Sequence, residues 1–217
     1  MLRYRKGAEP TELKPMQNTP TGSYSDLGQK EKDSIRAALA RDQGWLCAYC
    51  QQRIEPDGES MDIEHWLAQA AHGEQNLNWS HMLGVCKGYF TIEGERIQHC
   101  DKSRGCAPLF LHPVEGRGAD PRPLLRYDAR GRLWSDDERA QSDIRALNLD
   151  SDAHVHLLRS NRAAVWQQLK QEIQKRGPSI GTIDQLLRHY QLQPGTKARP
   201  YLEFTRYLLL KWRRGFE

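Results

Sequence analysis

Apolar positions along the chain follow helical spacing in some segments and strand-like alternation in others, which predicts an α+β fold. Residues 1–24 are rich in Pro, Thr and Gly and show no helical period, so we expect an extended arm there. A helix is predicted from about Asp26 to Gln43, because Ile35 and Leu39 fall on one helical face.

The middle of the chain carries the pattern of short strands separated by turns. One strand is expected around Arg53–Ile54 and a second at MDIEH, residues 61–65, after a Pro-Asp-Gly turn. Residues 87–99 are expected to be a loop insertion. The segment LLRYDARGRLW, residues 124–134, predicts a β-hairpin that turns at Asp128 to Gly131.

The last part of the chain has helical periodicity. A long helix is expected from Asp150 or Ser151 to about Arg176, with its apolar residues on one face. Shorter helices are expected near 182–191 and 200–214. The last helix has apolar residues over more than one narrow stripe, so it either packs on its neighbours or also offers a docking face.

These patterns divide the chain into three segments. We expect an N-terminal arm and helix at 1–43, a cysteine-containing core with an insertion and a hairpin at 44–134, and a helical region at 135–217. The arm could wrap around a partner or remain a mobile terminus.

Composition narrows the class of protein. The chain has 217 residues, a net charge of +4 and a hydrophobic share of 38%, which permits a nucleic-acid partner without requiring one. The N-terminus lacks the apolar segment of a secretory signal, and no apolar run reaches the roughly 18 residues of a membrane span. We therefore expect a cytoplasmic protein that does not contact a membrane.

Clustered cysteines in a reducing compartment bind metal more often than they form disulfides. Cys47 and Cys50 form a C-x2-C pair, and Cys86 and Cys100 supply two further thiols on either side of residues 87–99. Four sulfur ligands in a tetrahedron suit Zn²⁺. We predict a structural zinc site at these four cysteines.

Two alternatives to this zinc site remain open from the sequence. His99 and Cys106 are further candidates for the fourth ligand. Cys47 and Cys50 could instead be ordinary buried thiols or a redox pair, although a redox pair usually sits at a strand-to-helix junction of an α/β fold.

The residues after the C-x2-C pair match the needs of phosphodiester hydrolysis. That reaction requires an activated water, neutralisation of the phosphate charge and help for the leaving oxygen. Glu64 would hold a hard cation such as Mg²⁺, and His65 would accept a proton from water. Asp101 follows Cys100 directly, so a zinc site would fix its position as a second oxygen ligand.

Three further side chains accompany this set. Lys102 and Arg104 follow Asp101 and suit phosphate contacts. His81 lies between the two halves and would orient the backbone or the catalytic loop. Each of these residues alone is more often an ordinary polar residue or a cap, so the prediction depends on their order along the chain.

This order resembles the HNH, or ββα-metal, nucleases in their zinc-clipped, treble-clef-like form. In that family a hairpin and a helix grip one divalent cation. The resemblance implies that Glu64 and Asp101 hold Mg²⁺ or Mn²⁺, that His65 is the general base and that His81 takes the middle position. The chain departs from the family in having His81 where Asn is usual, and in the long insertion before Cys100.

A more extensive resemblance covers about the first 150 residues. The segments KGAEPTEL, LCAYCQQRI, IEHW, LNWSHMLGVCKG, HCDKSRG and LNLDSD are similar to the HNH-nuclease subunits of Septu-type anti-phage systems, the PtuB family. That family includes the HNH partner encoded beside some retrons. The resemblance implies an ABC-type, PtuA-like ATPase partner, with a retron reverse transcriptase and its msDNA as a further partner.

The sequence therefore predicts a metal-dependent HNH endonuclease of bacterial anti-phage defence, acting with an ATPase on DNA or RNA. The alternative is a non-catalytic, zinc-stapled module that binds nucleic acid or a protein partner. The patterns do not distinguish DNA from RNA as the substrate.

Overall fold

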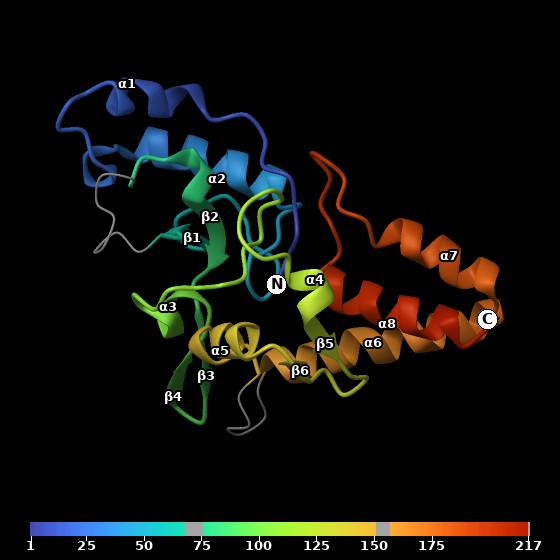
Figure 1. Cartoon of the computed structure of the whole chain (residues 1–217). Helices are drawn as coiled ribbons and strands as arrows, with labels where there is room; N and C mark the ends of the chain where they lie inside the picture. Colours follow the sequence, from blue (N-terminus) through green and yellow to red (C-terminus); the bar gives the residue numbers. More distant parts are fainter. Residues whose placement is uncertain (68–75, 151–156, 217) are drawn as a thin grey trace.

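The computed structural model describes residues 1–67, 76–150 and 157–216. Within them, three antiparallel two-stranded sheets are surrounded by helices (Figure 1). The elements in chain order are η1 (Thr11–Leu13), α1 (Lys14–Gln17), η2 (Tyr24–Asp26), α2 (Gln29–Asp42), β1 (Met61–His65), η4 (Trp79–His81), β2 (Met82–Cys86), β3 (Tyr89–Ile92), β4 (Glu95–Gln98), α3 (Asp101–Arg104), α4 (Pro121–Leu124), β5 (Leu125–Tyr127), β6 (Leu133–Ser135), α5 (Glu138–Ala146), α6 (Leu157–Arg176), α7 (Ile180–His189) and α8 (Leu202–Arg214).

The β1–β2 hairpin lies at the centre of the fold and is covered by α2. The predicted strand MDIEH is β1, and its register places His65 opposite Met82. The Gln43 side chain, at the end of α2, donates to the Gly84 carbonyl at 2.8 Å and accepts from the Gly84 amide at 2.8 Å. A Cβ at Gly84 would lie 2.7 Å from Met61 Cε, so a larger residue there would require the Met61 side chain to move.

The helix α2 begins later than the sequence predicted. Ser23 and Asp26 form a capping box around the separate 3-10 turn η2. Leu27 is extended and buried, and α2 starts only after Gly28. The expected start at Asp26 is wrong because that side chain caps the preceding turn instead.

Two predictions for the middle segment also need correction. The expected strand around Arg53–Ile54 is a single bridge between Leu46 and Arg53. Residues 87–99, expected to be a loop, contain the β3–β4 hairpin. The predicted hairpin within 124–134 is confirmed as β5 and β6, which pair from Leu125 with Ser135 to Tyr127 with Leu133.

The C-terminal region is helical, as predicted. The helix α6 ends at Arg176, and the predicted start at Ser151 lies outside the described residues. The helix α8 begins at Leu202, after Tyr201 adopts a left-handed φ of 56°. Phe204, on α8, is fully buried, so this helix packs into the core of the chain.

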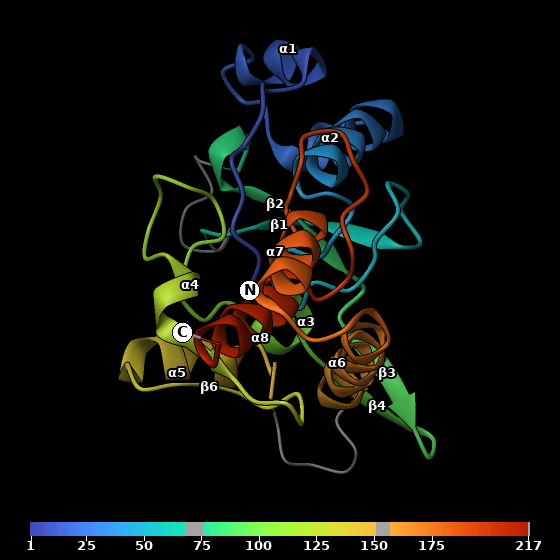
Figure 2. The same cartoon turned by 90° about the vertical axis from the view of Figure 1, so that its right-hand side faces the viewer.

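The N-terminal arm is part of the core. Leu2 and Tyr4 are buried, and their amides donate to the carbonyls of Ala48 and Pro113, each at 2.9 Å. Figures 1 and 2 both show the N-terminus in the middle of the molecule. The arm is therefore held against its own chain, and residues 11–17 within it form short helical turns instead of extended chain.

One cluster of buried apolar side chains contains residues from all three segments of the chain. The division at residues 43 and 134 stays a prediction. Among the described helices, none has the length and apolar character needed to cross a lipid bilayer.

We predict that Leu2→Ala lowers the free energy of unfolding by about 2–5 kcal/mol, because it leaves a cavity in a fully buried position. The matched control is Leu210→Ala. Leu210 is 39% exposed, so this substitution should change the free energy of unfolding by only about 0.5 kcal/mol. Urea unfolding measures both. Equal small effects would contradict the packing of the arm.

Candidate functional site

Four cysteine side chains from distant segments lie together beside the β1–β2 hairpin. Cys47 and Cys50 lie in the turn after α2, Cys86 ends β2, and Cys100 precedes α3. All four are buried, and their sulfur atoms lie within 4.8 Å of one another. The Sγ–Sγ distances are 3.8 Å for Cys47–Cys100, 3.7 Å for Cys50–Cys86 and 3.8 Å for Cys86–Cys100.

These distances fit a zinc ion. Sulfur ligands at about 2.3 Å from a tetrahedral Zn²⁺ are roughly 3.8 Å from one another. The four-cysteine cluster could therefore hold zinc, as the sequence predicted.

The structure decides between the candidates for the fourth ligand. Cys106 is exposed and is not part of the cluster. His99 is buried with Nδ1 3.2 Å from the Sγ of Cys100 and 3.9 Å from that of Cys86. Cys100 completes the cluster, and His99 is placed to donate a hydrogen bond to a metal-bound thiolate.

The long insertion between Cys86 and Cys100 does not separate them in space. The strands β3 and β4 pair with each other, and the amide of His99 donates to the Gly88 carbonyl at 2.8 Å. Gly88 has a φ of 67°, and a Cβ there would lie 2.6 Å from the His99 carbonyl oxygen. The hairpin thus returns the chain to its starting point, so an unusual spacing in sequence still gives a compact cluster.

Glu64 lies on the face of β1 that meets α3. Its carboxylate accepts a hydrogen bond from the Tyr49 hydroxyl at 3.2 Å and forms an ion pair with Arg104. Burial raises the pKa of Glu64, Arg104 opposes this shift, and the negative charge of Asp101 adds to it. The negative charge of Asp101 therefore acts on the Glu64 carboxylate.

Arg104 is a buried residue whose guanidinium forms hydrogen bonds with several neighbouring segments. Only 4% of the residue is exposed, so the phosphate contact predicted for it does not fit this geometry. Besides Glu64, its guanidinium donates to the Ala107 carbonyl at 2.7 Å, the Trp66 carbonyl at 2.6 Å, the His65 carbonyl at 3.4 Å and the Tyr49 hydroxyl at 3.3 Å.

Asp101 sits at the start of α3 in a mixed network of charges. Lys102 Nζ lies 3.1 Å from the Asp101 carboxylate and 3.1 Å from that of Asp62, which also binds Lys87 at 2.6 Å. The second oxygen of Asp101, Oδ1, is buried and accepts no hydrogen bond from the described residues. Burial raises the pKa of Asp101, and the neighbouring Lys102 opposes this shift.

His65 projects from the opposite face of β1, as strand alternation requires. Its Nε2 lies 2.7 Å from the Asn76 carbonyl oxygen, and its ring meets that of Tyr24 edge-on with 4.7 Å between centroids. A carbonyl only accepts hydrogen bonds, so Nε2 carries the proton and the lone pair is on Nδ1. Burial is the main cause that lowers the pKa of His65. Burial therefore favours the neutral imidazole over the imidazolium.

His81 lies at the end of η4, beside the residue that follows His65. Its ring stacks on Trp66 with 6.4 Å between centroids. A charge on His81 is one of the causes that lower the pKa of His65. The structure therefore places His81 in the surroundings of His65, whereas Glu64 and Asp101 lie toward α3.

The described residues contain one group of three or more His, Cys, Asp or Glu side chains close enough to hold a metal ion, the four cysteines. The predicted ligands Glu64 and Asp101 do not form a second one in this structure. The chain's own cations, Arg104 and Lys102, occupy their surroundings instead.

The sequence-based prediction missed three residues of this region. Asp62 shares the α3-facing side of β1 with Glu64, and alternation within MDIEH was a signal for it. Tyr49 and His112 carried no such signal. The His112 ring lies 4.5 Å from that of Trp66, and burial lowers the pKa of His112 to about 3.

Comparison with known proteins finds similarity to a protein of an anti-phage system. The chain is similar to Septu protein PtuB of Bacillus thuringiensis, with 24% identity over 101 residues. The match covers 46% of this chain and 37% of that protein, so it spans well under half the length of the relative. No protein-family model matches the chain.

We predict that Cys47→Ser removes bound zinc and lowers the melting temperature, because the cluster joins three distant segments. His65→Ala should leave the zinc content unchanged, since His65 is not a member of the cluster. Metal analysis of the purified variants and thermal unfolding are the measurements. Equal loss of zinc in both variants would contradict the separation of the cluster from His65.

We also predict that Arg104→Ala lowers the free energy of unfolding by about 3–5 kcal/mol, because it leaves the Glu64 carboxylate buried without its partner. Adding Glu64→Gln should restore part of this stability. Lys102→Ala is the matched control, since its side chain is 43% exposed and its ion pairs should contribute only about 1 kcal/mol. An equal effect of Arg104→Ala and Lys102→Ala in urea unfolding would refute the buried pair.

Proposed function

We propose that this chain is a metal-dependent endonuclease of the HNH type, which hydrolyses phosphodiester bonds of nucleic acid. The observation that carries the proposal is the placement of Asp101 by the four-cysteine cluster. Cys100 belongs to the cluster and Asp101 follows it directly, and the negative charge of Asp101 is one of the causes that raise the pKa of Glu64. Two carboxylates near one another would be suitable ligands for a hard divalent cation.

The roles proposed for the side chains are those that the resemblance to HNH nucleases implies. His65 is proposed to accept a proton from the attacking water, and the Asn76 carbonyl lies 2.7 Å from its Nε2. The water oxygen forms a bond to phosphorus, and the bond from phosphorus to the leaving 3′ oxygen breaks. Glu64 and Asp101 would hold Mg²⁺ or Mn²⁺, which neutralises phosphate charge and stabilises that leaving oxygen when bound.

The remaining predicted residues take supporting roles. Lys102 is partly exposed beside Asp101 and is proposed to contact a phosphate group of the substrate. His81 is proposed to position the segment around His65 through its stacking on Trp66. Arg104 is not part of this set, because its donors are used inside the protein.

We further propose that the chain acts in anti-phage defence beside an ABC-type, PtuA-like ATPase subunit. The similarity to Septu protein PtuB supports this role. The ion pair between Arg104 and Glu64 adds a physical reason for a partner, since cation binding at Glu64 requires this guanidinium to move or to be shared. A retron reverse transcriptase with its msDNA is the other proposed partner.

A second candidate function is a non-catalytic, zinc-stapled module that binds nucleic acid or a protein. One observation favours it directly. Glu64 is already paired with Arg104, and it does not form a metal-binding group with Asp101 and a third ligand among the described residues. In this case the charged network would serve stability and recognition.

Cleavage assays separate the two functions. The chain, co-purified with a PtuA-like ATPase subunit, is incubated with plasmid DNA and with total RNA in the presence of Mg²⁺ or Mn²⁺. We predict that His65→Ala lowers the cleavage rate by about 10²–10⁴-fold, the usual contribution of a general base. His189→Ala, at an exposed position on α7, is the matched control and should cleave like the wild type.

The two functions then differ in outcome. Cleavage by the wild type with binding but no cleavage by His65→Ala supports the nuclease. Binding without cleavage by every protein, in both metals and with the ATPase present, would refute the nuclease and favour the module.

A further inference from the structure

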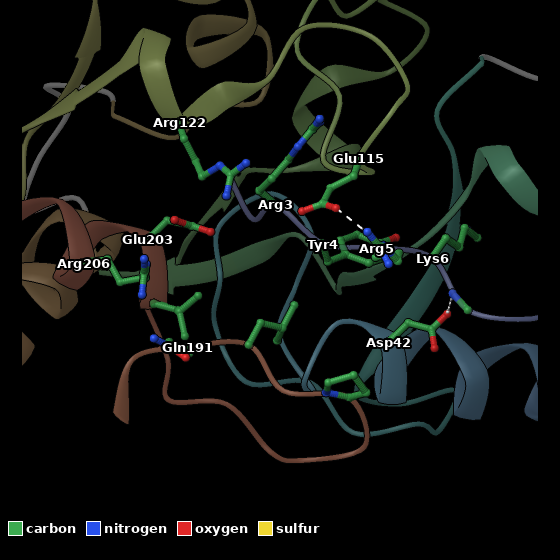
Figure 3. A pocket seen from close by; sticks show the side chains of 14 residues that line it. Arg3, Tyr4, Arg5, Lys6, Asp42, Glu115, Arg122, Gln191, Glu203 and Arg206 are labelled. Atoms are coloured by element: carbon green, nitrogen blue, oxygen red, sulfur yellow. Dashed lines mark hydrogen bonds and ion pairs between the residues drawn. The ribbon is translucent and has the colours of Figure 1, made fainter. Parts of the chain in front are cut away.

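The N-terminal residues 3–7, RYRKG, line a cavity to which no role in hydrolysis has been assigned (Figure 3). Its volume is about 540 Å³, within the range of roughly 300–1,000 Å³ that is usual for ligand sites. Glu115 and Arg122 form another wall, and the loop 191–194 with the start of α8 completes it. The cavity thus lies where all three segments of the chain meet.

Basic side chains dominate the rim of this cavity. Arg3, Arg5, Lys6, Arg122 and Arg206 all line it. Figure 3 shows Arg206 at one end and Lys6 at the other, with Arg122 and Arg3 between them along one side. A groove lined by such cations can attract the phosphate groups of a nucleic-acid strand.

Three of these cations are not held in a close ion pair. Among the described residues, neither Lys6 nor Arg206 forms an ion pair with a carboxylate, and Arg5 lies 3.8 Å from Glu115 with its side chain 89% exposed. Arg206 donates to the Tyr190 carbonyl at 2.8 Å, which fixes its position without neutralising it. Burial lowers the pKa of Lys6 to about 7, and a bound anion would favour its charged form.

The acidic residues of the cavity have partners within the chain. Asp42 accepts a hydrogen bond from the Gly7 amide at 2.7 Å and lies 3.5 Å from Arg41. Glu203 lies in the field of Arg206 and Arg122, whose charges oppose the rise that burial causes in its pKa. Glu115 lies 3.8 Å from Arg5.

The Lys6 end of the cavity leads to the proposed nuclease site. Lys6 Nζ donates to the Met82 carbonyl at the edge of β2, and Met82 is the strand partner of His65. The positive charge of Lys6 also contributes, after burial, to the lowered pKa of His65. A chain of phosphates that runs past Lys6 would therefore approach the end of the hairpin that bears His65.

We propose that this cavity binds the phosphate groups of a nucleic-acid strand and guides that strand from Arg206 past Lys6 toward His65. Guanidinium groups bind phosphate through paired hydrogen bonds, and such contacts fix the register of a strand without reading its bases. The proposal rests on the nuclease function and names how its substrate is held. A free nucleotide shares the same phosphate chemistry, and the experiment distinguishes the two sources.

Binding is measured by fluorescence anisotropy with labelled single-stranded DNA and RNA oligonucleotides over a range of salt concentrations. The full chain with His65→Ala serves as the background, so that cleavage does not interfere. Arg5→Ala and Arg206→Gln are combined, because Arg5 is exposed and glutamine keeps a donor for the Tyr190 carbonyl. Arg130→Ala, at an exposed turn outside the cavity, is the control that removes one positive charge elsewhere.

We expect the combined variant to bind oligonucleotides roughly tenfold more weakly at low salt. The slope of log K against log salt should also become smaller, by about 0.7 for each phosphate that the protein no longer neutralises. Arg130→Ala should bind as the background does. An unchanged slope in the combined variant, or an equal weakening in Arg130→Ala, would overturn the proposal. The proposal would also be overturned if ATP or AMP binds in a way that requires Arg206 while oligonucleotide binding does not change. That result would assign the cavity to a free nucleotide.

Failure of this proposal and failure of the nuclease function look different. If the wild type cleaves and the combined variant binds normally, the cavity does not lie on the substrate path, but the nuclease function stands. If no protein cleaves, but the salt-dependent binding disappears in the combined variant, the cavity proposal is supported and the nuclease function is refuted.

Discussion

The arrangement of four sulfur atoms is the constraint on which the rest of this structure depends. They join the turn after α2, the end of β2 and the start of α3, three places that local structure alone would not bring together. A two-stranded hairpin is marginally stable by itself. The cluster and the Gln43 bonds to Gly84 supply the fixed points that hold β1 and β2.

The period of two residues along β1 then divides the candidate site. Glu64 faces α3, and His65 faces Tyr24 and the Asn76 carbonyl. The carboxylates on the α3 side are balanced by cations from the same chain, above all the buried Arg104. Removing one partner of such a buried pair leaves the other charge uncompensated, so the Glu64 carboxylate depends on Arg104 in this structure.

The N-terminal arm links the site to the rest of the molecule. Its buried residues Leu2 and Tyr4 pack into the core, while the side chains between and after them face the basic cavity. Lys6 touches both regions, since it lines the cavity and donates to the Met82 carbonyl of β2. The KGAEP motif therefore has a structural position that connects the hairpin with the C-terminal helices.

The sequence by itself determined the features that depend on local pattern: β1 at MDIEH, the hairpin within 124–134, the C-terminal helices and the C-x2-C pair. Periodicity and turn chemistry encode these within a few residues. The four-cysteine cluster also follows the sequence prediction, and the structure leaves the spare candidates His99 and Cys106 outside it. The tertiary structure alone decided that Arg104 is buried and that the arm enters the core. Burial and the meeting of distant side chains depend on how the whole chain packs, which spacing along the sequence does not record.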